Sequence, residues 1–451
     1  MNRREFLAAS AQVAVPKRRP NVLYLHSHDT GRSVQPFGHA VPTPNLQKFA
    51  ESGVLFRQAF SGAPTCSPSR SALLTGQCAH SSGMVGLAHR GFRLHDPHQH
   101  LANFLRGHGY RTALSNIQHE TASNLVSTLG YEEVLPRRDN SGPETARAAV
   151  DFLNRKPREP FFLSCGFFET HREFPVAGAK EDPRYALPPA PLPDTAAVRK
   201  DMANFKASAR VLDESMGAVL AALESNGFED DTLVICTTDH GIAFPSMKCN
   251  LTDHGIGVML MLRGPGGFAG GKVSDAMVSH VDLFPTVCEV LDLPKPAWLQ
   301  GRSLLPLMRG ERAEVRDALF AEVSYHAAYE PMRAVRTRRW KYIRRFDDRG
   351  RPNLPNCDDG FSKTEWIRYG WRERPVPSDE LYDLIFDPAE RRNLAADTLF
   401  SQTRDEMRNR LNAWMRETAD PLLHGKVPAP PGAAVNDPEG ESPKEKTFIL
   451  P

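Results

Sequence analysis

Three hydrophobic runs in this chain are each followed closely by polar residues of a similar kind. The runs and their polar ends are Asn21–Leu25 before His26-Ser27-His28-Asp29, Phe161–Phe167 before Glu169-Thr170-His171, and Thr232–Thr237 before Thr238-Asp239-His240-Gly241. A short continuous hydrophobic run predicts a strand buried on both faces, as in a parallel sheet. Between the second and third runs, hydrophobic residues in 204–226 recur at helical spacing and predict a helix.

Strands that alternate with helices predict an α/β fold, with a mostly parallel sheet sandwiched by helices. Ligands of such sheets bind beyond the carboxyl ends of the strands, so the three polar ends predict one site. We assign residues 20–318 to this main domain. Shorter strand-like pieces and the helical stretch 403–418 predict a smaller C-terminal α+β subdomain over residues 319–427. Residues 428–451 are rich in Pro, Gly and charge, and we expect a tail with little structure of its own.

Composition narrows the class of protein. The chain has 451 residues, of which 40% are hydrophobic and 24% charged, as in an ordinary globular enzyme. Its formal net charge of +2 does not favour nucleic acid or membrane surfaces as partners. No run of about 18 hydrophobic residues occurs, so we expect no membrane span.

The first 19 residues read as a leader. Arg3-Arg4 followed by Phe6-Leu7 resembles a twin-arginine export signal. The hydrophobic segment that follows is interrupted by Gln12 and is short against the usual length of about 7–15 residues. Two interpretations stay open: a working signal, with a periplasmic or secreted protein, or a leader without targeting function and a cytoplasmic protein.

One of the seven cysteines stands in a distinctive context. The cysteines are dispersed, without a Cys-x-x-Cys pair, which argues against a disulfide scaffold and a structural zinc site. Cys66, however, begins the sequence Cys-Ser-Pro-Ser-Arg, and Thr75-Gly76 follows. The commoner role of such a cysteine is structural, at the start of a buried helix. Arg70, one turn later, argues for function because a guanidinium suits anionic oxygens.

This motif resembles the signature of the sulfatase family, Cys-x-Pro-Ser-Arg with a following Thr-Gly. The resemblance implies an alkaline-phosphatase-like fold, with a mixed, mostly parallel sheet, and a partner enzyme that oxidises Cys66 to formylglycine. The aldehyde hydrates to a diol, one hydroxyl of which attacks sulfur, while the other later expels sulfate. Residues 239–248 look like the matching stretch of the sulfamidases (N-sulfoglucosamine sulfohydrolases). A sulfated sugar or glycan is therefore the expected substrate, with N- and O-sulfate both open.

The resemblance also implies one divalent metal, held by Asp29, the pair Asp239-His240 and the formylglycine of Cys66. Calcium is the usual metal of the family. The first strand usually ends in two aspartates, whereas here the pair is His28-Asp29. An imidazole in place of a carboxylate removes a negative charge and softens the site, so Ca²⁺ stays the expected metal, with Mn²⁺ and Zn²⁺ as alternatives. Alternatively, His28 binds substrate and the metal has one ligand fewer.

Four further residues match catalytic positions of the family. Arg70 and Lys248 are expected to hold sulfate oxygens, and His119 or His171 to protonate the leaving group. A lysine usually lies two residues before the first histidine, but here that residue is Ile117. Arg90, Arg172 and Glu173 lie near the ends of motifs and are candidates for contacting the sugar.

Two other functions stay open on the sequence alone. Some relatives of sulfatases use formylglycine on phosphorus substrates, and His28 with a softer metal would suit a phosphonate monoester hydrolase or phosphodiesterase. The departures at His28 and Ile117 would also suit an inactive glycan-binding relative, although Cys66, Arg70 and Lys248 are all retained.

Overall fold

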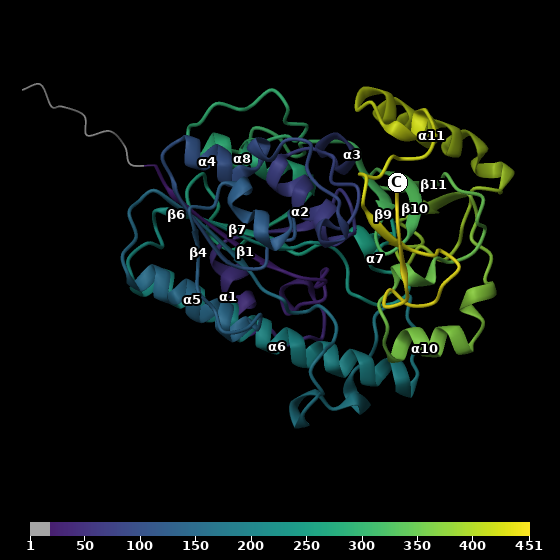
Figure 1. Ribbon diagram of the computed structural model, residues 1–451, viewed down its shortest axis with the longest axis horizontal. Helices are drawn as coiled ribbons and strands as arrows, with labels where there is room; N and C mark the ends of the chain where they lie inside the picture. The colour runs from purple at the N-terminus through teal and green to yellow at the C-terminus, as the bar shows by residue number, and fades with distance from the viewer. Residues whose placement is uncertain (1–18) are drawn as a thin grey trace, which may run out of the picture.

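A computed structural model describes residues 19–451 of the chain. The twin-arginine motif at Arg3-Arg4 lies outside the described residues. Helices enclose a large central sheet, and a smaller sheet lies beside it (Figure 1). The α/β class with a mostly parallel sheet and a smaller α+β unit is therefore confirmed.

The central sheet has eight strands in the order β4-β3-β5-β1-β6-β7-β2-β8. Their bounds, in chain order, are β1 Asn21–Ser27, β2 Val54–Phe60, β3 Arg111–Asn116, β4 Glu133–Val134, β5 Phe161–Gly166, β6 Thr232–Thr238, β7 Leu260–Arg263 and β8 Lys272–Ser279. Only β7 is antiparallel to its neighbours, β6 and β2, so the other strands all run in one direction.

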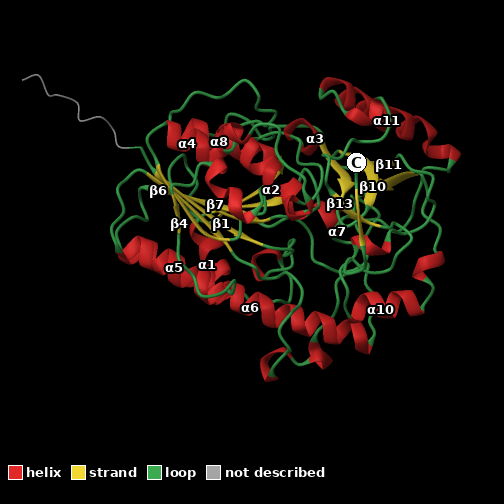
Figure 2. Cartoon of the chain, in the orientation of Figure 1, coloured by secondary structure: helices red, strands yellow, loops and turns green. Residues whose placement is uncertain are grey.

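Hydrophobic side chains cover both faces of this sheet. One face packs against α2 (Cys66–Thr75), α4 (Leu101–Gly107) and α8 (Leu283–Val290). The other packs against α1 (Pro44–Ser52), α5 (Gly142–Asn154) and the long α6 (Ala196–Ser225). The two layers lie above and below the sheet in Figure 2. Within residues 19–451, no helix combines the length and hydrophobicity that crossing a bilayer requires.

The strands that the sequence predicts end level with one another. β1 lies between β5 and β6, with His26 opposite Gly166 and Ser27 opposite Thr238. Their polar ends therefore meet at one edge of the sheet, as expected for neighbouring parallel strands.

The smaller sheet is antiparallel, in the order β12-β11-β10-β9. Its strands are β9 Leu319–Tyr325, β10 Tyr329–Arg336, β11 Trp340–Arg345 and β12 Asp379–Asp383, and α11 (Ser401–Glu417) packs against it. The remaining α-helices are α3 Ala79–Ser82, α7 Asp253–Ile256, α9 Leu305–Met308 and α10 Phe361–Arg368.

The expectation of a largely unstructured tail is wrong. Strands β13 (Ala434–Asn436) and β14 (Thr447–Ile449) pair in an antiparallel hairpin. Ala433 and Val435 are buried and belong to the same hydrophobic cluster as side chains of α2 and α8. The prediction failed because it used the average composition of the segment. The few hydrophobic residues that are buried were averaged with the exposed Pro, Gly and charged residues around them.

Candidate active site

The end of β1 turns sharply at Asp29. This residue has φ 52°, a left-handed conformation that Asp tolerates better than most residues. Its amide N–H donates to Asp239 Oδ1 at 2.8 Å, which ties the end of β1 to the end of β6. The turn therefore brings Asp29 and Asp239 to one point.

His28, Asp29, Cys66 and Asp239 form a buried cluster in which one ligand atom from each lies within 4.8 Å of the others. His28 Nδ1 is 3.2 Å from Asp29 Oδ1 and 3.3 Å from Asp239 Oδ2. Burial alone would raise the pKa of the Asp239 carboxyl, but neighbouring His240 and Arg70 hold it well below its usual value. The cluster thus gathers carboxylate and imidazole donors, the ligands of a divalent metal.

His240 lies beside this cluster and is oriented as a metal ligand would be. Its Nδ1 lies 3.1 Å from the carbonyl oxygen of Gly241, which can only accept, so the proton is on Nδ1. Its Nε2 is buried, has no hydrogen-bond partner within the described part of the chain, and lies 3.3 Å from Asp29 Oδ1. An imidazole held through one nitrogen, with the other left free in an acidic cluster, fits a metal ligand.

Cys66 is the first residue of α2 and is 3% exposed. The helix begins here because Pro68 fits its first turn, and all ten of its residues are buried. Burial raises the pKa of the Cys66 thiol well above its usual value, so the unmodified residue stays a neutral thiol.

Arg70 lies one turn further along α2 and is fully enclosed. One of its terminal nitrogens donates to Asp239 Oδ2 and to the carbonyl of Ser27, both at 3.0 Å. The other contacts His26 Nδ1. The guanidinium is therefore fixed beside both the cysteine and the acidic cluster.

Lys248 reaches the cluster from the loop after β6. Its Nζ is 2.9 Å from Asp29 Oδ2 and 2.8 Å from Asp358 Oδ2. Asp358 comes from the segment after β11, and sequence reasoning missed it. No local pattern could have revealed it, because it meets Lys248 across a separation of 110 residues.

Two further histidines, His119 and His171, lie at the outer side of the cluster, against His28. His28 Nε2 is 3.2 Å from His119 Nδ1, and the rings of His28 and His171 are 4.7 Å apart. Burial, reinforced by Arg70, lowers the pKa of His119 to about 3, so it is neutral near pH 7. The side chain of His171 is 24% exposed and therefore borders the solvent.

Not every candidate from the sequence reaches this cluster. Arg172 makes a bidentate ion pair with Asp201, at 2.6 and 2.8 Å, which occupies its terminal nitrogens. Conversely, His326, between β9 and β10, was not predicted. It is 5% exposed, its Nδ1 is buried without a partner among residues 19–451, and burial followed by the charge of Lys248 lowers its pKa.

Comparisons with known proteins point to one family. The model of the sulfatase family matches residues 20–293, and that of the N-sulphoglucosamine sulphohydrolase C-terminal domain matches residues 247–357. Human N-sulphoglucosamine sulphohydrolase is 31% identical, over 90% of this chain and 92% of the human protein.

Solved structures share the fold. A protein in complex with its substrate D-glucosamine-2-N,6-O-disulfate superposes with a TM-score of 0.71 at 17% identity, over 91% of this chain and all of that one. The phosphonate monoester hydrolase of Agrobacterium radiobacter superposes with a TM-score of 0.67 at 23% identity, over 90% of this chain and 97% of that one.

Proposed function

This chain belongs to the sulfatase family and is a hydrolase of sulfuric esters or sulfamates, and we propose that it acts on a sulfated sugar through Cys66. The observation that carries the proposal is the buried cluster of Cys66 with His28, Asp29 and Asp239. The family uses a formylglycine and a metal, and the cluster provides a cysteine in the family motif beside metal-ligating side chains. The sugar is inferred from the relatives, one named for N-sulphoglucosamine and one bound to a sulfated glucosamine.

We propose that an oxidising maturation enzyme converts Cys66 to formylglycine before the chain has folded. The 3% exposure of Cys66 supports this order, because another enzyme could not reach the thiol in the folded protein. When hydrated, formylglycine would supply the nucleophilic hydroxyl. The buried arginine and the start of α2 would hold this side chain in one orientation.

Asp29, Asp239, His28 and His240 would hold the metal, which would polarise the sulfate and favour ionisation of the nucleophile. We propose Mn²⁺ or Zn²⁺ as strong alternatives to Ca²⁺, the usual ion of the family. Calcium takes six to eight oxygen ligands as a rule, whereas half of this side-chain set is imidazole.

Arg70 and Lys248 would neutralise the sulfate. Arg70 is fixed by Asp239 and the Ser27 carbonyl, so its position is set before substrate arrives. Lys248 bridges two carboxylates, and a sulfate oxygen would replace one of these contacts. His171 is the better candidate for protonating the leaving group, because it borders the solvent, whereas His119 is held against His28.

The mass of the tryptic peptide that contains Cys66 tests the proposal first, with protein from a host shown to convert a control sulfatase. We expect the aldehyde or its hydrate. An unmodified thiol in that host would contradict the proposed nucleophile.

A phosphonate monoester hydrolase or phosphodiesterase is the second candidate. Two imidazoles beside two carboxylates favour a softer metal, and a phosphonate monoester hydrolase shares the fold. Hydrolysis of an aryl sulfate and of a matched aryl phosphate diester separates the two. A kcat/KM higher for the diester would move the assignment to phosphorus substrates.

A further inference from the structure

The loop between β13 and β14, residues 437–446, is held beside the active site by contacts from three separate segments of the chain. We call it the C-terminal loop. Its base is anchored in the core, because Ala433 is fully buried and Asn436 N donates to Ala327 O at 2.8 Å. The loop is also braced internally, since Glu445 Oε1 accepts from the amides of Glu441 and Ser442. It is therefore a formed structural element.

Three outer contacts of the C-terminal loop fall next to residues that border the active site, whereas its Glu439 and Glu441 pair with arginines further away, Arg349, Arg351 and Arg372. Pro443 O accepts from Arg90, which follows His89, whose ring lies 6.2 Å from that of His119. Ser442 Oγ donates to Asp359 Oδ2 at 2.6 Å, directly after the Asp358 that bonds Lys248.

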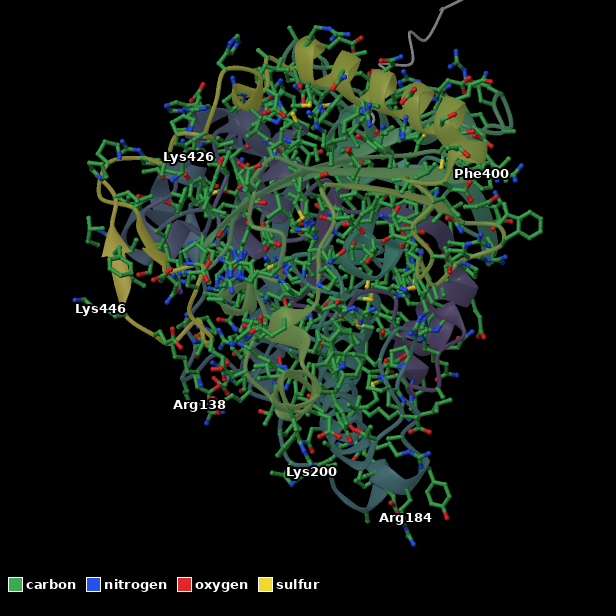
Figure 3. All side chains as sticks on the ribbon, turned by 90° about the vertical axis from the view of Figure 1, so that its right-hand side faces the viewer. Arg138, Arg184, Lys200, Phe400, Lys426 and Lys446 are labelled. Atoms are coloured by element: carbon green, nitrogen blue, oxygen red, sulfur yellow. The ribbon has the colours of Figure 1, made fainter. Side chains whose placement is uncertain are left out.

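The third contact joins Lys444 Nζ to Glu173 Oε1 at 2.8 Å, two residues after His171. Three separate segments that border the cluster thus converge on one loop. Figure 3 looks onto the side of the molecule that carries this segment and labels Lys446.

Two cations of this region are available to a ligand. The side chains of Lys444 and Glu173 are 69% and 82% exposed, so their ion pair contributes little and a competing anion can replace the carboxylate. Arg90 is half-buried and bonds three neutral oxygens, of Ala327, Asn436 and Pro443. No ion pair joins it to a carboxylate within residues 19–451, so its charge is uncompensated by a close partner.

We infer that the C-terminal loop forms one wall of the substrate entrance, and that Lys444 and Arg90 bind a second anionic group of the substrate. This inference rests on the proposed function and specifies its substrate class: a sugar that carries another sulfate or a carboxylate besides the group removed. Lys444 acts here as a specificity residue, because it meets the part of the substrate that does not react.

The test compares two substrates that differ by one sulfate, D-glucosamine N-sulfate and D-glucosamine-2-N,6-O-disulfate. We expect a higher kcat/KM for the disulfate. Lys444→Glu should lower the ratio of the two values about five- to tenfold, and Glu173→Gln should raise it about two- to threefold. The preference should also shrink as salt is added, because the groups are exposed.

Lys446→Glu is the matched control. It makes the same change of charge two residues away, at an exposed side chain in the same loop, and should leave the ratio unchanged. A ratio that stays at the wild-type value in Lys444→Glu, or that falls equally in Lys446→Glu, would overturn the inference.

If the proposed sugar substrate is wrong, the experiment gives a result that can be told apart from failure of the inference about the loop. If the wild-type protein cleaves an aryl sulfate but neither sugar, the sugar assignment falls. The wall is then tested with an aryl sulfate with and without a carboxylate. If Lys444→Glu leaves the ratio of the two kcat/KM values for that pair unchanged, the inference about the C-terminal loop is also overturned.

Discussion

His28 is the residue whose chemistry departs most from the family pattern. Its Nδ1 lies between the carboxylates of Asp29 and Asp239, at 3.2 and 3.3 Å, and its Nε2 meets His119. Burial lowers its pKa well below the usual value, more than the adjacent Asp239 raises it, so the ring is neutral. A neutral imidazole between two carboxylates is suited to share a cation with them.

His28→Asp should therefore move the metal preference of the protein towards Ca²⁺. The added carboxylate oxygen suits a hard cation, and the lost imidazole disfavours Mn²⁺ and Zn²⁺, so we expect relative affinities to shift by about tenfold or more. Metal content by elemental analysis and thermal shifts with each ion measure this without an activity assay. His89→Asp, at the exposed histidine near the entrance, is the control. Equal shifts in both variants would place His28 outside the metal site.

At this scale the sequence predicts residues that lie in motifs and misses those that do not. Asp29, Cys66 and Asp239 stand at strand or helix ends and meet as expected. Asp358 and His326 come from the smaller sheet and its connections, where neither periodicity nor spacing marks them. Their position depends on how two units pack, which no local pattern contains.

Among the elements, the turn after β3 depends on the last residue of β5. Gly166 lies opposite His26 on one side and Asn116 on the other. A Cβ at Gly166 would lie 2.0 Å from Ile117 O and 2.7 Å from His26 Cε1. Because the turn passes this close, it delivers His119, with φ 67°, to His28.

Gly166→Ala should displace residues 117–119 and impair both catalysis and stability, because the new Cβ meets a backbone oxygen. A shift of about 1 Å in a catalytic group can cost about 100-fold in rate, and we expect a loss of kcat of that order. Gly107→Ala, at a position with open space around it, is the control and should retain wild-type kcat. Steady-state kinetics and the melting temperature of both variants provide the comparison. Unchanged kcat in Gly166→Ala would show that the turn adjusts freely.

The strands were easier to predict than their directions. The hydrophobic runs at 21–25, 161–167 and 232–237 correspond to β1, β5 and β6, with ends that differ by at most two residues. A mixed, mostly parallel sheet was expected, but β7 was not identified as its antiparallel strand, because a strand buried on both faces has the same hydrophobic pattern in either direction. Direction follows from the connections, which the pattern leaves undetermined.

Across the whole molecule, a buried ion-pair network joins the main sheet's helical layer to the smaller sheet. His80 of α3 bonds both oxygens of Glu322 in β9 at 3.0 Å. Arg333 of β10 lies 3.4 Å from Glu322 and bonds Asp420 beyond α11. Cys78, His80 and Glu322 also lie close enough to surround a metal, but His80 and Arg333 already balance the carboxylates of Glu322 and Asp420.

This network predicts how stability depends on pH. Burial alone would lower the pKa of His80, but Glu322 and Cys78 raise it to about 11. The unfolded chain loses this proton near pH 6.5, so between the two values the folded state binds more protons. The contribution of His80 is therefore complete below about pH 6.5 and is lost as pH rises to about 11.

In that window the free energy of unfolding should fall by about 1.4 kcal/mol per pH unit on account of this one group. His80→Asn removes the group, so its unfolding free energy should depend less steeply on pH between pH 7 and 9, by that amount. Denaturant unfolding of both proteins at several pH values measures the difference.

Glu322→Gln is the second variant, because loss of the carboxylate lowers the folded pKa of His80 and flattens the same slope. Parallel pH profiles for all three proteins would mean that His80 is neutral in the folded state. The contact between the two units would then depend on Arg333 and Asp420 instead.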